Sequence, residues 1–122
     1  MTGPYKGKTG LRRIWNALSY SVDGLAAALR HEEAFRQEVV LALVLIPVAL
    51  WLPASGTGKA LMAGSVLLVL VVELINSAIE AATDRVSLEH NALAKRAKDM
   101  GSAAVMLSLI GACATWLLVL FG

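Results

Sequence analysis

Polar side chains interrupt one long apolar stretch of the sequence at spacings that place them on one side of a helix. They stand at offsets of 0, 3, 7 and 11 residues. Because an α-helix turns by about 100° per residue, side chains at these offsets fall within about 80° of one another. Carboxyl and amide groups in such a row could accept a proton and hold a metal ion. The row consists of Glu73, Asn76, Glu80 and Asp84.

Glu73 is the member of this row that lies deepest in the apolar stretch. The 13 residues before it, 60–72, carry no formal charge. A carboxylate in hydrocarbon costs several kcal/mol unless it is paired, protonated or hydrated. Such a residue suits a general base, but it also suits a protonated side chain that hydrogen-bonds to a neighbouring helix. The stretch alone leaves both interpretations open.

Two clusters of charge border the other apolar stretches. One lies at residues 32–38 and includes three glutamates, and the other is formed by Lys95, Arg96, Lys98 and Asp99. Mg²⁺ prefers one or two carboxylates plus substrate phosphates, and lysines neutralise charge in phosphoryl transfer. The clusters therefore suit a metal-bound polyphosphate. The alternative is that they only anchor helix ends in lipid headgroups.

The apolar stretches predict an all-α membrane protein with three transmembrane helices. The 122 residues are 57% hydrophobic and 16% charged, whereas soluble domains are about a quarter charged. Residues 100–121 carry no formal charge, and at 1.5 Å per residue they can cross a hydrocarbon core of about 30 Å. We predict one domain over residues 1–122, with spans at about 34–52, 58–84 and 97–121.

The first span is the shortest of the three. Its apolar run, 39–52, has 14 residues, so it must include 34–38 or lie tilted in a thinned bilayer. Pro47 lies inside this run, and it predicts a kink there.

Residues 11–30 predict an amphipathic helix that lies on the membrane surface. Apolar side chains recur there at steps of three and four, and charged side chains lie off that stripe. Trp15, beside the stripe, suits a helix in the headgroup plane. A soluble helix packed on a partner is the alternative. The stripe consists of Leu11, Ile14, Leu18, Val22, Leu25 and Leu29.

The distribution of basic residues predicts the orientation. Of 11 lysines and arginines, six lie in residues 1–38 and four in 85–98, which leaves only Lys59 in the other loop. The positive-inside rule then places the N-terminus in the cytoplasm and the C-terminus outside, with Trp51 and Trp116 near the outer interface. The net charge of +2 is too small to suggest a nucleic-acid partner.

Small residues on one side of the third span predict a homo-oligomer. Three spans make a thin bundle with little room to bury a polar row, and small residues let helices approach closely in lipid. The small residues are Gly101, Ala104, Ser108, Gly111 and Thr115.

Three runs of the sequence resemble the prokaryotic integral-membrane diacylglycerol kinases. They are 34–38 (AFRQE), 73–85 (ELINSAIEAATDR) and 96–105 (RAKDMGSAAV). The resemblance extends over almost the whole chain from about Gly10, with the same order, spacing and number of spans.

The resemblance implies a homotrimer in the bacterial cytoplasmic (inner) membrane, with three spans and an amphipathic surface helix in each subunit. It implies transfer of the γ-phosphate of ATP to diacylglycerol, with Mg²⁺ as cofactor, to give phosphatidic acid. Glu73 matches the catalytic base, and Glu32 and Glu80 match metal-binding carboxylates. In a trimer, one subunit's second span could face another subunit's surface helix and form a shared site.

The resemblance also implies substrate contacts. The expected nucleotide-binding residues are Arg13, Tyr20, Glu32, Asn76, Glu80, Glu89, His90, Asn91, Lys98 and Asp99. The expected lipid-substrate residues are Arg13, Ala34, Phe35, Arg36, Gln37, Glu38, Trp51, Glu73, Ser102 and Trp116.

Three other functions fit parts of this pattern. An undecaprenol kinase would have the same fold and similar carboxylate motifs. A small transporter could use Glu73 as a proton-coupled site, although the charges at 95–99 would then have no role. A membrane adaptor without enzymatic activity would tolerate Glu73→Gln with little change beyond stability.

Overall fold

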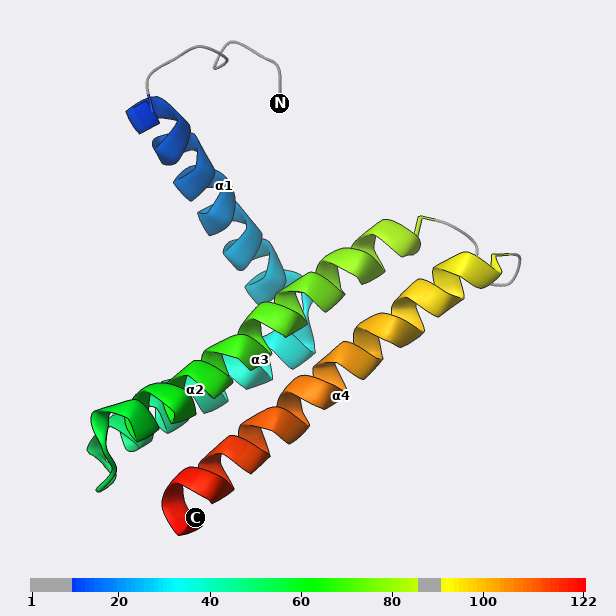
Figure 1. The fold of residues 1–122 in the computed structure, drawn as a ribbon. Helices are drawn as coiled ribbons and strands as arrows, with labels where there is room; N and C mark the ends of the chain where they lie inside the picture. Colours follow the sequence, from blue (N-terminus) through cyan, green and yellow to red (C-terminus); the bar gives the residue numbers. More distant parts are fainter. Residues whose placement is uncertain (1–9, 86–90) are drawn as a thin grey trace. The chain divides into compact units, whose positions relative to one another are not determined.

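A computed structural model describes residues 10–85 and 91–122, and this part of the chain is helical throughout apart from short connections (Figure 1). Its helices are α1 (Gly10–His31), α2 (Glu33–Trp51), α3 (Gly56–Thr83) and α4 (Ala92–Phe121). The chain divides into two compact units, residues 1–33 and 34–122. Each unit is described by itself.

The first unit consists of α1. This helix has 22 residues and ends with Arg30 and His31 in its last turn. Basic side chains at a helix C-terminus interact favourably with the negative end of the helix dipole. Most α1 side chains are exposed, and Ala28 is the buried residue of this helix.

The second unit consists of α2, α3 and α4, which run up and down beside one another (Figure 1). Helix α2 continues through Pro47, although a proline removes one backbone hydrogen bond. The kink expected there stays a prediction. The chain then turns at residues 52–55, where Leu52 N–H still donates to Val48 O over 2.9 Å.

Side-chain caps define where α3 and α4 begin. The hydroxyl of Ser55 accepts a hydrogen bond from Gly58 N over 3.0 Å, and the amide oxygen of Asn91 accepts one from Ala94 N over 3.0 Å. Each cap satisfies one of the backbone N–H groups that a helix N-terminus leaves without an intrahelical partner.

The core of the second unit lies along one face of α3. The buried residues of this helix are Gly58, Met62, Val66, Val69 and Glu73. They recur at steps of three and four, which places them in one stripe. Met62 is fully buried. Most close contacts between helices in the described residues join α3 to α4.

Helix α4 packs antiparallel to α3, with contacts from Lys98 to Val119. At one end, Gly58 of α3 lies against Val119 of α4. Further along, Trp116 Nε1 donates to Met62 O over 3.2 Å. At the other end, Lys98 Nζ lies 2.8 Å from Asp84 Oδ1. The pairing therefore fixes the register of the two helices at both ends.

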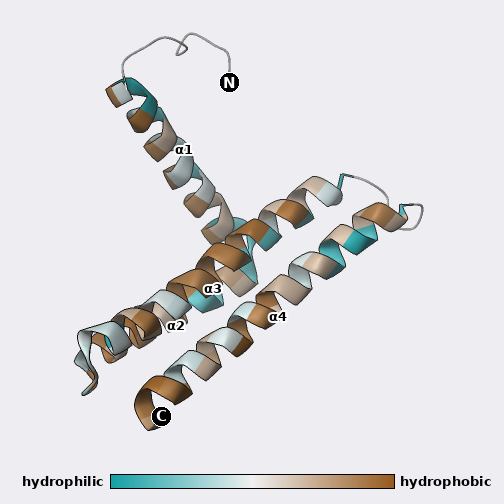
Figure 2. Ribbon diagram, viewed as in Figure 1, coloured by the Kyte–Doolittle hydropathy of each residue, from teal (hydrophilic) through white to brown (hydrophobic). Residues whose placement is uncertain are grey.

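Helices α2, α3 and α4 are long and apolar enough to cross a membrane. Large apolar side chains remain exposed on all three, including Leu43, Leu107 and Leu118. Figure 2 shows hydrophobic residues along the middle of these helices, with hydrophilic residues toward one end of α4. An exposed apolar surface of this extent suits a lipid environment or contact with other subunits.

Candidate functional site

The polar row on α3 begins at a buried acid. Glu73 is 7% exposed and is the one buried charged or polar side chain among the described residues. It continues the stripe of Met62, Val66 and Val69, so its carboxyl group lies on the packed face of α3. Burial of such a group is costly. Its place in the core therefore favours a specific role for this carboxyl group.

One turn further along α3, Asn76 packs against the backbone of α4. Its Oδ1 atom is buried and has no hydrogen-bond partner in the part of the chain that the structure describes. Gly101 lies beside this oxygen, and a Cβ atom at position 101 would overlap it. A buried acceptor without a partner costs about 1–3 kcal/mol, so this arrangement calls for an explanation.

The row continues through Glu80 and ends at Asp84, at the C-terminal end of α3. Glu80 is half-buried, and Asp84 follows one turn later as the C-cap of α3. Thr83 Oγ1 donates to Ile79 O over 2.8 Å, which keeps that hydroxyl on its own helix. Between Glu73 and Glu80 the helix rises by about 10 Å. The row thus extends from the interior of the bundle to its end.

Basic residues of α4 meet the row at this end. Lys98 Nζ is 2.8 Å from Asp84 Oδ1, and Lys95 Nζ is 2.8 Å from Asp99 Oδ2. The Lys95 and Asp99 side chains are well exposed, whereas the Lys98 side chain is 27% exposed. Exposed ion pairs contribute little stability. The Asp84–Lys98 pair therefore matters chiefly because it holds an ammonium group beside the carboxylates of α3.

The two predicted metal-binding carboxylates lie in different units. Glu80 belongs to α3, whereas Glu32 follows the last turn of α1, where its N–H donates to Ala28 O over 2.9 Å. Within residues 10–85 and 91–122, no group of three or more His, Cys, Asp or Glu side chains is placed to hold a metal ion. Magnesium held by one or two carboxylates and substrate phosphates does not require such a group.

The predicted nucleotide contacts are distributed over both units. Arg13 and Tyr20 are exposed on α1. Asn91 caps α4, and its amide oxygen accepts from Ala94 N. Glu89 and His90 lie outside the described residues.

Eight of the ten predicted lipid contacts lie on α2 and α4, whereas Arg13 lies on α1 and Glu73 on α3. Ala34, Arg36 and Gln37 are exposed in the first turns of α2, whereas Phe35 is 2% exposed and packs inward. The remaining residues of this set differ in exposure. Ser102 and Trp51 are exposed, Trp116 is half-buried against α3, and Glu38 is half-buried.

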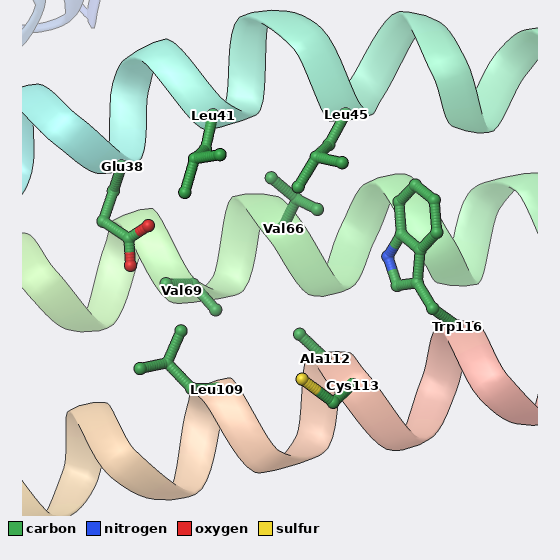
Figure 3. Close-up of a pocket in the computed structure, with 9 residues that line it drawn as sticks. All are labelled: Glu38, Leu41, Leu45, Val66, Val69, Leu109, Ala112, Cys113 and Trp116. Carbon is green, nitrogen blue, oxygen red and sulfur yellow. The ribbon is translucent and has the colours of Figure 1, made fainter.

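An apolar pocket of about 230 Å³ lies between α2, α3 and α4 (Figure 3). Glu38 supplies its carboxylate, and Trp116 lines the pocket nearer the other end. Both residues were expected to contact the lipid substrate, but the sequence does not predict the pocket, because its walls come from three helices and depend on the register between them. The remaining lining residues are Leu41, Leu45, Val66, Val69, Leu109, Ala112 and Cys113.

Comparison with known proteins gives matches over nearly the whole chain. The model of a family described as prokaryotic diacylglycerol kinase matches residues 19–120. A protein of Pseudomonas aeruginosa named diacylglycerol kinase is 56% identical over 119 residues, which cover 98% of this chain and 97% of that one. A protein of Escherichia coli K12 with the same name is 48% identical over 113 residues, which cover 93% of each chain. One of Helicobacter pylori 26695, also so named, is 48% identical over 107 residues, which cover 88% of this chain and 83% of that one.

The cap at Asn91 generates a prediction that separates its structural role from nucleotide binding. Asn91→Ala removes the acceptor for Ala94 N and is expected to lower the free energy of unfolding by about 0.5–2 kcal/mol. Asn91→Ser keeps a capping oxygen and is expected to keep the wild-type stability. Denaturation in detergent measures both variants. If the two variants have equal stability but both raise the KM for ATP, Asn91 acts on the nucleotide and not as a cap.

Proposed function

Because the chain belongs to the prokaryotic diacylglycerol kinase family, we propose that it transfers the γ-phosphate of ATP to the hydroxyl of diacylglycerol, giving phosphatidic acid and ADP. The protein is a lipid kinase. The observation that carries the proposal is the polar row on α3, in which a buried Glu73 is followed along the same side of the helix by Asn76, Glu80 and the Asp84–Lys98 pair.

In this reaction Glu73 is the general base. Diacylglycerol keeps its acyl chains in the bilayer and its hydroxyl near the headgroups, so a base must lie inside the bundle and close to one end. Glu73 would accept the hydroxyl proton as the oxygen forms a bond to the γ-phosphorus, and the bond from that phosphorus to the leaving ADP oxygen breaks. A positioned base contributes about 10²–10⁴-fold in rate.

The charged end of the bundle would bind the triphosphate. Glu80 and Glu32 fit a magnesium ion by donor chemistry, since carboxylate oxygens are the ligands that this ion prefers. When bound, Mg²⁺ would neutralise phosphate charge. The ammonium group of Lys98 lies 2.8 Å from Asp84 Oδ1, and its positive charge would attract phosphate oxygens. Arg13, Tyr20 and Asp99 join this set by resemblance to the family.

The pocket between α2, α3 and α4 would hold an acyl chain of the lipid. Its lining is almost wholly apolar, and the carboxylate of Glu38 lies at the end where α2 begins (Figure 3). That polarity matches a lipid whose chain enters the bundle while its glycerol stays near the headgroups.

The topology follows from charge. Residues 1–38 and 85–98 carry ten of the 11 basic residues, and the positive-inside rule places these two segments on the cytoplasmic side, where ATP is available. In this arrangement α1 would lie on the inner membrane surface through its apolar stripe. The C-terminus would lie outside the cytoplasm.

Replacing the buried acid tests the activity. Glu73→Gln preserves the shape of the side chain but cannot accept the proton, so kcat is expected to fall by at least about 100-fold while the folded oligomer persists. The assay uses purified protein in mixed micelles with Mg-ATP and diacylglycerol, and phosphatidic acid is the readout. Asp23→Asn, an exposed carboxylate on α1, is the control and should retain activity.

The same assay distinguishes the substrates. A wild-type protein that phosphorylates undecaprenol in preference to diacylglycerol would refute the proposed substrate. A Glu73→Gln protein that keeps full turnover would refute the proposed base.

Filling the pocket tests the site for the acyl chain. Ala112 lines the pocket, and Ala112→Phe is expected to lower kcat/KM for long-chain diacylglycerol by roughly tenfold or more, the scale of steric discrimination in an apolar pocket. Ala114→Phe introduces the same side chain at an exposed position of α4 and should leave kcat/KM near wild type. Equal effects of the two variants would show that the pocket does not hold the lipid.

A homotrimer would let Glu32 of one subunit act together with the row on α3 of another subunit. Light scattering in detergent is expected to give a protein mass of three times 12.9 kDa. Oligomers mixed from Glu73→Gln and Glu32→Gln subunits are expected to regain activity that neither variant has alone. If mixing restores nothing although mixed oligomers form, each site belongs to one subunit.

A further inference from the structure

The contact between Asn76 and Gly101 joins the two helices at the polar row. A Cβ atom at position 101 would overlap Asn76 Oδ1 and would come within 3.2 Å of Asn76 Cγ. Gly111, ten residues further along α4, differs in this respect, because a Cβ atom there would meet nothing within 4 Å. The close approach is therefore specific to position 101 and not a property of every glycine on α4.

The geometry of the contact determines how the amide of Asn76 is oriented. Its oxygen is the atom nearest to Gly101, followed by Cγ and Cβ. Because the oxygen and the nitrogen of an amide occupy opposite arms of a planar group, the N–H donors are directed away from the α4 backbone. The oxygen is buried and has no hydrogen-bond partner among the described residues.

Asn76 lies on the same side of α3 as two carboxylates. Glu73 precedes Asn76 by three residues and Glu80 follows it by four, and side chains at these spacings are neighbours on a helix. An N–H donor held between them can orient a carboxylate or a phosphate oxygen. This placement depends on the rotamer of Asn76, which the contact with Gly101 restricts.

We propose that Gly101 is a positioning residue for phosphoryl transfer, because the lack of a side chain there lets the Asn76 oxygen rest against α4 and directs the Asn76 N–H donors toward Glu73 and Glu80. The inference rests on the proposed kinase activity. Gly101 does not itself contact a reacting atom. It acts through Asn76.

Substitution of Gly101 is expected to disturb the reaction more than the fold. The atom that a new Cβ meets is the end of a side chain, which can rotate away, so α3 and α4 can keep their packing while the amide moves. Gly58 offers a matched comparison near the other end of the same interface. A Cβ atom there would lie 2.9 Å from Val119 Cγ1, which is also a side-chain end.

The first experiment compares Gly101→Ala with Gly58→Ala in the full-length protein in mixed micelles. Gly101→Ala is expected to lower kcat by about 10- to 100-fold, the effect of a small misplacement of a site group, with KM values within about twofold of wild type and the same oligomer. Gly58→Ala is expected to keep kcat within about twofold. Wild-type kcat in Gly101→Ala, or an equal loss in both variants, would overturn the proposal.

A second measurement shows whether Gly101 acts through Asn76. In an Asn76→Ala background the amide is absent, so adding Gly101→Ala is expected to cause no further loss of kcat. A loss by the same factor in both backgrounds would show that Gly101 acts independently of Asn76, and it would refute the positioning role.

A third measurement does not depend on activity. The ¹⁵N resonance of the Asn76 side-chain amide is expected to shift in Gly101→Ala and to stay in place in Gly58→Ala. If the wild-type protein does not phosphorylate diacylglycerol, the proposed function fails, but this resonance still reports the contact. An unmoved Asn76 resonance in Gly101→Ala would overturn the inference even in an active enzyme.

Discussion

The antiparallel packing of α4 on α3 is the interaction on which the candidate site depends. It buries the stripe that ends in Glu73, brings Lys98 to Asp84 and places the backbone of Gly101 against Asn76. In lipid there is little hydrophobic gain from bringing two apolar helices together, so close packing and interhelical polar contacts must hold them. The contacts that stabilise the pair are thus the same contacts that arrange its polar groups.

The arrangement of polar groups on α3 extends between the two environments in which the proposed substrates lie. The proposed lipid substrate stays in hydrocarbon, whereas a triphosphate stays in water. A single helix that carries a buried acid, an amide and an interfacial acid within a rise of about 10 Å can contact both. The neighbouring cations are supplied by α4, whose first turns carry Lys95 and Lys98 before its long apolar portion begins.

The features that follow from periodicity could be predicted from the sequence, because hydrophobicity and helix geometry determine them locally. The row from Glu73 to Asp84 and the apolar character of three helices are of this kind. The helix that contains the third predicted span begins before the apolar portion of that span. The helix begins at Ala92, since the Asn91 cap and the polar residues that follow extend it beyond the apolar portion.

Features that depend on the register between helices could not be predicted. The sequence placed Gly101 and Gly111 in one stripe of small residues, but within the chain only Gly101 is in tight contact with α3. Ser108 and Thr115 from the same stripe donate to carbonyl oxygens of their own helix, Val105 O and Gly111 O. The pocket likewise requires three helices at a defined spacing. A sequence pattern identifies small residues that would permit two helices to approach closely. It does not show at which of these residues the close contact is formed.

The hydrogen bond from the Trp116 indole to the carbonyl oxygen of Met62 restricts substitution at position 116 more than at position 62. The acceptor is a backbone atom, so any residue at position 62 that preserves the helix still offers it, while the donor is lost with any side chain at 116 that lacks an N–H group. Position 62 is fully buried, so substitutions there are limited by volume and apolar character but not by this hydrogen bond, whereas a substitution at 116 must also supply an N–H donor.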